Sequence, residues 1–216
     1  EEGMTAIPGY LMRDCARLKT ITWASSITSI GTYAFNYCTG LEELVIPGKI
    51  ATIGDNAFSY CSGLKSVTLQ EGTATIGRYT FEVCTGLTGM TFPASVTKID
   101  SYAFWNCSNL GSVTLPEKLE ELNGCAFGGT ALTNITIPAT LKTVDTAYAD
   151  GTYGHGPFYK CEKLETVTFE EGMTAIPGFL MRDCAGLKTI NWASSITSIG
   201  TYAFNYCTGL EELVIP

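Results

Sequence analysis

The sequence is poor in charged side chains, contains a single histidine and has no long apolar run. Lys, Arg, Asp and Glu together make up 16% of its 216 residues, whereas hydrophobic residues make up 45%. This balance is typical of a folded globular chain and excludes an intrinsically disordered one. No apolar run approaches the roughly 18 residues of a membrane-spanning helix. We therefore expect no direct insertion into a membrane.

The few charges are mostly acidic, which limits the partners of the chain. The formal net charge is −8. An acidic surface is repelled by the phosphates of nucleic acids and by anionic lipids. We therefore expect neither nucleic acid nor a membrane surface as a partner.

Groups of residues that support catalysis or metal binding are also missing. His155 is the only histidine, and no Cys-x-x-Cys pair occurs. Zinc sites and hydrolytic triads need several such side chains together. Acidic pairs such as Glu42 and Glu43 recur with the repeat described below, so they are expected to be solvated edges and not catalytic carboxylates. The sequence predicts a protein that is not an enzyme and has no metal site and no cofactor.

What the sequence does contain is a repeat. From Met4 onward it divides into nine units, usually 23 residues long, with the consensus I-x-x-I-G-x-x-A-F-x-x-C-x-x-L-x-x-V-T-I-P-x-x. A unit of this size cannot bury its own apolar side chains, but stacked units can bury each other's. The sequence therefore predicts one repeat solenoid over residues 1–216. Its units begin at Met4, Ile27, Ile50, Thr73, Val96, Leu119, Leu141, Met173 and Ile196.

A longer period is superimposed on the short one. Residues 27–47 and 196–216 are identical and lie 169 residues apart, which indicates that a block of seven units is duplicated. The unit at Leu119 is one residue short, and the unit at Leu141 is nine residues longer than the norm. We expect the regular geometry to be disturbed there. No secretory signal is visible and the pattern is already under way at the first residues, so a segment of a longer array is expected.

The end of each unit predicts a β-strand. Within 66–69, polar Ser66 and Thr68 alternate with apolar side chains, which is the pattern of a half-buried strand. Strands of successive units are expected to pair in parallel, about 4.8 Å apart. The Phe of A-F-x-x-C predicts a continuous buried spine. Its members are Phe35, Phe58, Phe81, Phe104, Phe127, Phe158 and Phe204, with Met12 and Met181 at the same position in two units.

Cysteine is the one reactive residue type that recurs. Eight of the nine cysteines occupy one repeat position, namely Cys15, Cys38, Cys61, Cys84, Cys107, Cys161, Cys184 and Cys207. They could form a disulfide or metal array, or a ladder of small buried side chains. Free Cys is among the most buried residue types, and the parallel Cβ vectors of stacked units disfavour a disulfide. The buried ladder is therefore favoured, with the thiols also capping backbone groups of the turn.

The motifs C-x-x-L-x-x-V and I-G-x-x-A-F-x-x-C, spaced by 23 residues over the whole chain, resemble the BspA-like leucine-rich repeat family. The resemblance implies a right-handed, curved leucine-rich-repeat coil with a parallel β-sheet on its concave face and little regular helix. It also implies an extracellular or cell-surface location and a role in adhesion to host or bacterial surface proteins. No catalytic residue comes with the resemblance.

The outward side chains of the strands are the first candidate binding surface. They are small, rich in hydroxyls and nearly uncharged, which suits either a polar groove for protein or glycan or a solvated sheet that uses Thr for its β-propensity. Without aromatic or Arg anchors, each unit should bind weakly and gain by repetition. Ice binding also uses regular Thr rows, but Glu43, Val45 and Asn191 interrupt the rows here. The candidate residues are Thr22, Ser66, Thr68, Thr91, Ser112, Thr114, Thr136 and Thr168.

An insertion at residues 146–156 is the second candidate. It reads TAYADGTYGHG and carries Tyr148, Tyr153 and His155. Loops on rigid scaffolds often carry recognition, although a tolerated excursion explains the segment equally well.

Two functions therefore remain open at the level of sequence. The first is a non-enzymatic surface module for binding or adhesion, with a protein or glycan as partner. The alternative is a structural stalk or a filament that stacks on itself. The first and last units lack the polar caps that solenoids usually need, so end-to-end association of such units is expected.

Overall fold

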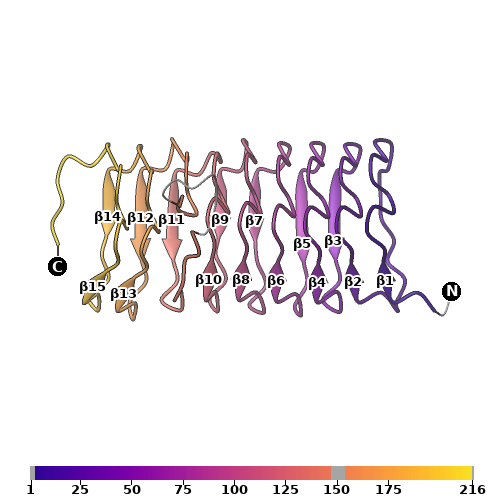
Figure 1. Ribbon diagram of the computed structural model, residues 1–216, viewed down its shortest axis with the longest axis horizontal. Coiled ribbons are helices and arrows are strands. Elements are labelled where there is room, and N and C mark those ends of the chain that lie inside the picture. Colours follow the sequence, from indigo (N-terminus) through magenta and orange to yellow (C-terminus); the bar gives the residue numbers. More distant parts are fainter. Residues whose placement is uncertain (1–2, 147–153, 216) are drawn as a thin grey trace.

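The computed structural model describes residues 3–146 and 154–215, and these residues contain strands and turns but no helix. Figure 1 shows a row of coils along one axis, most of them with strands on two sides. The seven longer strands are β3 (Glu43–Ile46), β5 (Ser66–Leu69), β7 (Gly89–Thr91), β9 (Ser112–Thr114), β11 (Asn134–Ile137), β12 (Thr166–Phe169) and β14 (Thr189–Asn191). The eight short strands are β1 (Ala6–Ile7), β2 (Ser29–Ile30), β4 (Thr52–Ile53), β6 (Thr75–Ile76), β8 (Lys98–Ile99), β10 (Glu121–Leu122), β13 (Ala175–Ile176) and β15 (Ser198–Ile199).

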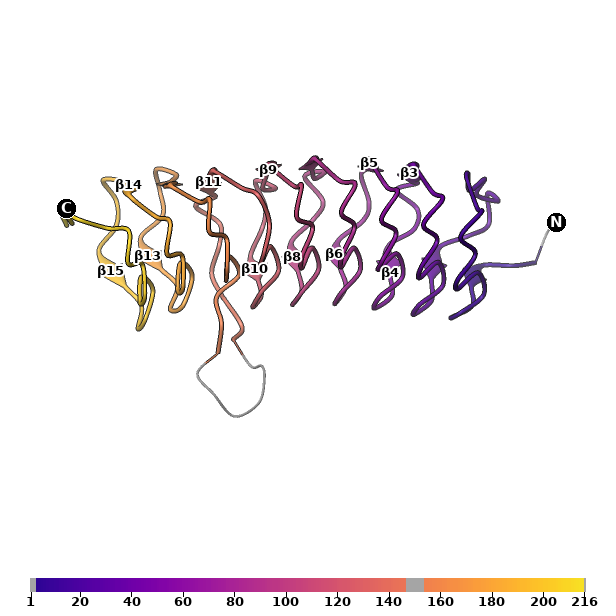
Figure 2. The ribbon, with the colours of Figure 1, turned by 90° about the horizontal axis from the view of Figure 1, so that it is seen from above.

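These strands confirm the predicted solenoid and its 23-residue step. The longer strands form what we call the long-strand face, and the short strands form the short-strand face. The turns around A-F-x-x-C form a third side, the turn face. Figures 1 and 2 show the coils following one long axis with only a slight bow, so we name the faces by their strands and not by curvature.

Every strand pair is parallel, as predicted, and equivalent residues face each other. Val45 pairs with Thr68 between β3 and β5, and Ile53 pairs with Ile76 between β4 and β6. In the long strands apolar residues point inward and polar residues mostly outward, which gives β5 its alternating exposed and buried pattern; Val45 on β3 is an exposed exception. Paired residues are therefore one repeat apart in the sequence. Residues at the same position of successive repeats, which we call a column, lie in a row along the solenoid.

The prediction that the long strands of all nine units pair was wrong in two respects. Among the described residues, the expected strands around Thr22 and Leu213 do not form. The long strands also form three separate sheets, with breaks between β5 and β7 and between β9 and β11. The first break adjoins Gly89, a residue that weakens a strand. The second adjoins the unit that is one residue short.

The most extensive sheet is instead the one that the sequence pattern did not reveal. Six short strands, from β1 to β10, pair in succession, and Glu121 bridges to Thr143 in the next unit. This sheet stops at the long unit, whereas β11 and β12 pair in register across it. The interruptions of the two faces are therefore staggered along the solenoid, so no single break separates the coils.

Hydrogen bonds between coils also run along the turn face. The amides of Tyr33, Phe35 and Tyr37 donate to carbonyls of the next coil at 3.0, 2.8 and 2.9 Å. This geometry needs two left-handed residues per coil, the one before A-F and the one before Cys. Among the described residues, sixteen non-glycine positions adopt φ between 55° and 64°. Because a left-handed L-residue costs roughly 1–2 kcal/mol, the inter-coil hydrogen bonds must offset a recurrent strain.

Val83 tests that strain, because a β-branched residue at φ 55° is unfavourable. Asn106 occupies the same position one coil later with the same φ of 55°, and Asn tolerates this region. We expect Val83→Asn to raise the free energy of unfolding by about 1 kcal/mol and Asn106→Val to lower it by about as much. Chemical denaturation of both variants measures the two effects. A Val83→Asn variant less stable than the parent would contradict the claim that Val83 is strained in its left-handed conformation.

The predicted phenylalanine spine is confirmed from Phe35 to Phe158, whereas Met12 and Phe204 near its ends are only half-buried. Rings of successive coils from Phe35 to Phe158 stack with centroids 5.2 to 5.9 Å apart. The leucine of C-x-x-L is fully buried beside it, as at Leu64 and Leu110. This core continues past the breaks in both sheets.

The cysteine ladder is confirmed as buried from Cys38 to Cys207, whereas Cys15 in the first coil is half-buried, and the described cysteines form no disulfide. From Cys38 onward, each thiol of the ladder donates to a backbone carbonyl of the preceding coil. Cys61 Sγ donates to the carbonyl of Phe35 at 3.3 Å, and Cys107 Sγ donates to that of Phe81 at 3.1 Å. In the short unit Thr130 takes the place of cysteine, and its hydroxyl donates to Phe127 O at 2.8 Å. This repeat position therefore requires a small buried side chain that donates a hydrogen bond, and it does not require the redox or metal-binding properties of a thiol.

Candidate functional site

The predicted hydroxyl rows lie on the long-strand face and point away from the core. Most of their members are exposed, but Thr168 is half-buried and accepts a hydrogen bond from Asn191 at 3.0 Å. Thr22 is exposed outside any strand. The rows therefore exist as predicted over the strands that form.

Four of the predicted residues surround a shallow hollow on this face, which we call the Gly89 hollow. Its volume is about 280 Å³. Hydroxyl side chains form its rim and apolar residues its floor, because outward and inward side chains alternate along each strand. Gly89 contributes no side chain, so the row of side chains has a gap at the centre. The lining residues are Ser66, Val67, Gly89, Met90, Thr91, Ser112, Val113 and Thr114.

The described residues of the insertion are not part of this surface. Tyr148 and Tyr153 lie outside the described residues. The described parts of the insertion run away from the long-strand face (Figure 2). His155 is half-buried there, with Nδ1 3.4 Å from Asp183 Oδ2 and its ring stacked on Tyr159 at 3.8 Å. The structure therefore separates His155 from the hydroxyl rows.

Sequence reasoning missed a stripe of aromatic side chains on the turn face. Tyr37 stacks on Tyr60 at 4.5 Å, and Tyr79 stacks on Tyr102 at 4.7 Å. Arg guanidinium groups lie over several of the rings of this face. The signal was the recurrence of Tyr at the two left-handed positions, which a consensus written with x conceals. Residue types that usually anchor interfaces are therefore present on the turn face, whereas no outward position of the described long strands holds one.

The buried thiols are chemically quiet. Burial raises the pKa of Cys61 to about 12 and that of Cys107 to about 12. For Cys125, burial is again the largest cause and raises the pKa to about 12. A thiol is a nucleophile or metal ligand only as the thiolate. The described residues also include no group of three or more His, Cys, Asp or Glu side chains placed to hold a metal ion.

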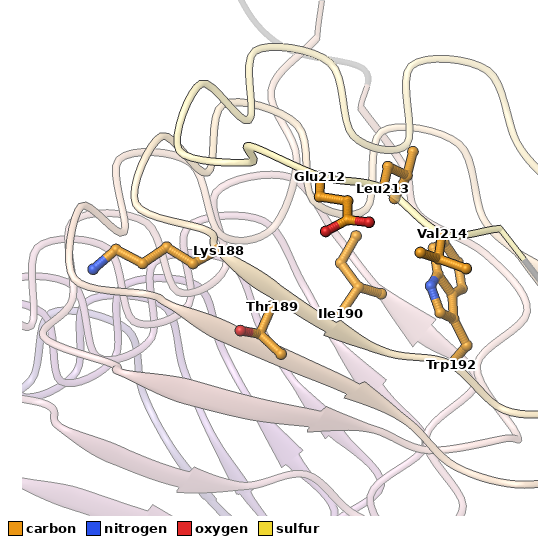
Figure 3. Close-up of a pocket in the computed structure, with 7 residues that line it drawn as sticks. All are labelled: Lys188, Thr189, Ile190, Trp192, Glu212, Leu213 and Val214. Carbon is orange, nitrogen blue, oxygen red and sulfur yellow. The ribbon is translucent and has the colours of Figure 1, made fainter.

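A second groove lies beside β14, and Figure 3 shows its lining. It has a volume of about 340 Å³ and separates β14 from residues 212–214, which do not pair with it. Val214 and Leu213 are exposed there. The groove marks the place where the expected last strand is missing, and it gathers none of the predicted binding residues. Its lining residues are Lys188, Thr189, Ile190, Trp192, Glu212, Leu213 and Val214.

The coils, the 23-residue step and the buried leucine column define a β-solenoid of the leucine-rich-repeat class. The family model described as the BspA type leucine rich repeat region matches residues 1–85, 30–152 and 151–216. The chain belongs to this family. No curated protein has a significant match to the sequence. In the described part of the chain, no helix is long and apolar enough to cross a membrane.

Solved structures of bacterial leucine-rich repeat proteins share the fold. A leucine-rich repeat protein from Bacteroides ovatus is 27% identical with a TM-score of 0.72, and the match covers 95% of this chain and 57% of that one. A leucine rich cell surface protein from Faecalibacterium prausnitzii is 25% identical with a TM-score of 0.50, covering 96% and 68%. A leucine-rich repeat protein of T. pallidum, at 20% identity and a TM-score of 0.59, covers 96% and 83% and supports the fold alone. The chain thus spans little more than half of the Bacteroides protein.

Proposed function

We propose that the chain is a non-enzymatic binding or adhesion module displayed outside the cell, with a host or bacterial surface protein or glycan as its partner. The observation that carries the proposal is the Gly89 hollow. It gathers Ser66, Thr91, Ser112 and Thr114 from three neighbouring coils around one concavity. The similarity to a bacterial cell surface protein supports the location.

The chemistry of the Gly89 hollow favours a polar ligand bound weakly at each site. Hydroxyl groups both donate and accept hydrogen bonds, so they suit the hydroxyls of a glycan or the backbone of a peptide. The hollow is shallow and its rim has neither charge nor aromatic rings. Strong attachment then requires many sites acting together, which a long array supplies through avidity.

Gly89→Thr is the sharpest test, because it fills the hollow without threatening the fold. A Cβ at this position would lie 3.0 Å from Ser112 Oγ, a hydroxyl that can rotate away. Since Thr suits a strand better than Gly, we expect the free energy of unfolding to rise by about 0.5–1 kcal/mol. Binding to a glycan array and to purified host surface glycoproteins should be lost.

Thr189→Gly is the matched control, because Thr189 lies in the same column on β14, outside the Gly89 hollow. It should lower stability by about 0.5–1 kcal/mol and leave binding unchanged. A Gly89→Thr protein that binds as well as the parent would refute the site. Absence of binding to every probe, together with rods that grow with concentration in light scattering, would support the structural alternative.

A further inference from the structure

The unit that is one residue short lines a hollow on the turn side, which we call the basic hollow. It has a volume of about 310 Å³ and is separate from the Gly89 hollow. Three successive coils line it, with the short unit as the floor. The lining residues are Asn106, Ser108, Gly129, Thr130, Ala131, Lys160, Glu162 and Lys163.

Lys163 stands at a repeat position that most coils fill with glycine. In most coils a glycine precedes the leucine of C-x-x-L, because a Cβ there would collide with the preceding coil. At Gly63 it would lie 2.2 Å from Thr39 O, and at Gly186 2.2 Å from Glu162 O. The coil after the short unit has Lys163 at this position. Asn109 also carries a side chain at this position, beside a full-length coil, and its amide donates to Thr85 O at 2.8 Å.

Gly129 lines the floor of the basic hollow and puts no side chain into it. Gly129 has φ 69°, and a Cβ on it would lie 2.4 Å from Asn106 Oδ1. Thr130 is buried and already bonded to the backbone of Phe127. The groups left to meet a ligand are therefore the Asn106 amide, the Ser108 hydroxyl and the charged side chains of the following coil.

The two lysines lack the carboxylate partner that several other lysines of the chain have. Lys65, Lys142 and Lys188 each pair with a glutamate of the preceding coil at 2.6 to 2.8 Å. Neither Lys160 nor Lys163 has a carboxylate within 4.0 Å in the described part of the chain. Lys160 Nζ instead lies 5.3 Å from the ring centre of Tyr159. In a protein with a net charge of −8, these two ammonium groups at one hollow leave a local site for an anion.

We propose that the basic hollow binds an acidic sugar residue. The lysines would hold its carboxylate through charge-assisted hydrogen bonds. Glu162, on the rim, disfavours a plain anion but accepts hydrogen bonds from sugar hydroxyls, and Asn106 and Ser108 add further partners. A hydroxy acid the size of one sugar ring satisfies both the positive and the negative groups.

NMR titration of the whole chain with glucuronate, glucose, acetate and inorganic phosphate tests the proposal. Saturable amide shifts at Lys160, Lys163 and Gly129 are expected with glucuronate, at least about tenfold tighter than with the other three probes. Lys160→Gln with Lys163→Gln should weaken glucuronate binding about tenfold or more. Equal binding of glucose would show that charge is irrelevant, and equal binding of acetate or phosphate that the hydroxyls are irrelevant. Either result, or no binding, overturns the proposal.

The matched control is the double variant Lys65→Gln with Lys188→Gln, which removes the same charge from two lysines that are already paired. It should leave glucuronate binding unchanged apart from a small general effect of net charge. A loss equal to that of the Lys160 and Lys163 variant would assign the binding to overall charge and refute the site.

Discussion

Replacing Phe81 by alanine is expected to lower the free energy of unfolding by about 3–5 kcal/mol. The ring is fully buried and stacks on Phe58 at 5.7 Å and on Phe104 at 5.3 Å. Its removal leaves a cavity that stacked coils cannot close without losing their hydrogen bonds. Thermal or chemical denaturation followed by circular dichroism measures the loss.

Phe81→Met is the control that the chain itself suggests, because Met181 is fully buried at the equivalent spine position. Methionine adapts its shape to fill a gap. The loss of stability should therefore be no more than about 1–2 kcal/mol. If the methionine and alanine variants were equally unstable, ring stacking and not volume would account for the spine's stability.

Arg182→Ala is expected to cost about 3 kcal/mol, because it removes a buried cation with several partners. Arg182 Nη1 donates to Gly154 O at 2.7 Å, and its Nε lies 3.4 Å from Asp183 Oδ2. Its guanidinium also lies within 6.0 Å of the ring centres of Phe179, Tyr202 and Tyr206. The variant should lose melting temperature and expose amides near Gly154 to hydrogen exchange.

Arg13→Ala is an unusually close control, because residues 11–16 and 180–185 have the same sequence. The side chain of Arg13 is 45% exposed, whereas that of Arg182 is 8% exposed. We expect Arg13→Ala to change stability by no more than about 0.5 kcal/mol. Equal effects at both positions would mean that the local sequence, and not the surrounding coils, sets the contribution of this arginine.

Periodicity sufficed to predict the solenoid, the parallel pairing, the inward and outward sides of each long strand and the spine. These features depend on residue types that recur in every unit. The short-strand sheet was missed because two residues such as Thr52 and Ile53 are too few to show an alternating pattern. The breaks between long strands were missed because they arise from single departures, Gly89 and one missing residue, whose effect depends on the neighbouring coils.

For the candidate site, too, the features that recur in every unit were predicted and those that depend on single residues were missed. Columns predicted which hydroxyls point outward, but only the spatial structure shows that four of them surround the gap at Gly89. The aromatic stripe escaped because its positions alternate among Tyr, Asn, Asp and Val, with left-handed φ as their shared property. The basic hollow brings together residues of three coils at the short unit, and a consensus does not reveal which side chains of different coils share one hollow.

Ile30 and Ile199 occupy the same place in two identical 21-residue segments, yet Ile30 is 2% exposed and Ile199 is 39% exposed. The burial of a unit is thus decided by the coils on either side of it. In such an array each unit contacts only its two neighbours. The free energy that stabilises the fold therefore comes mainly from the interfaces between adjacent units, and an isolated unit would have almost no stability. A copied block of seven units brings its own six internal junctions with it, so gene duplication can lengthen such an array without designing a new core.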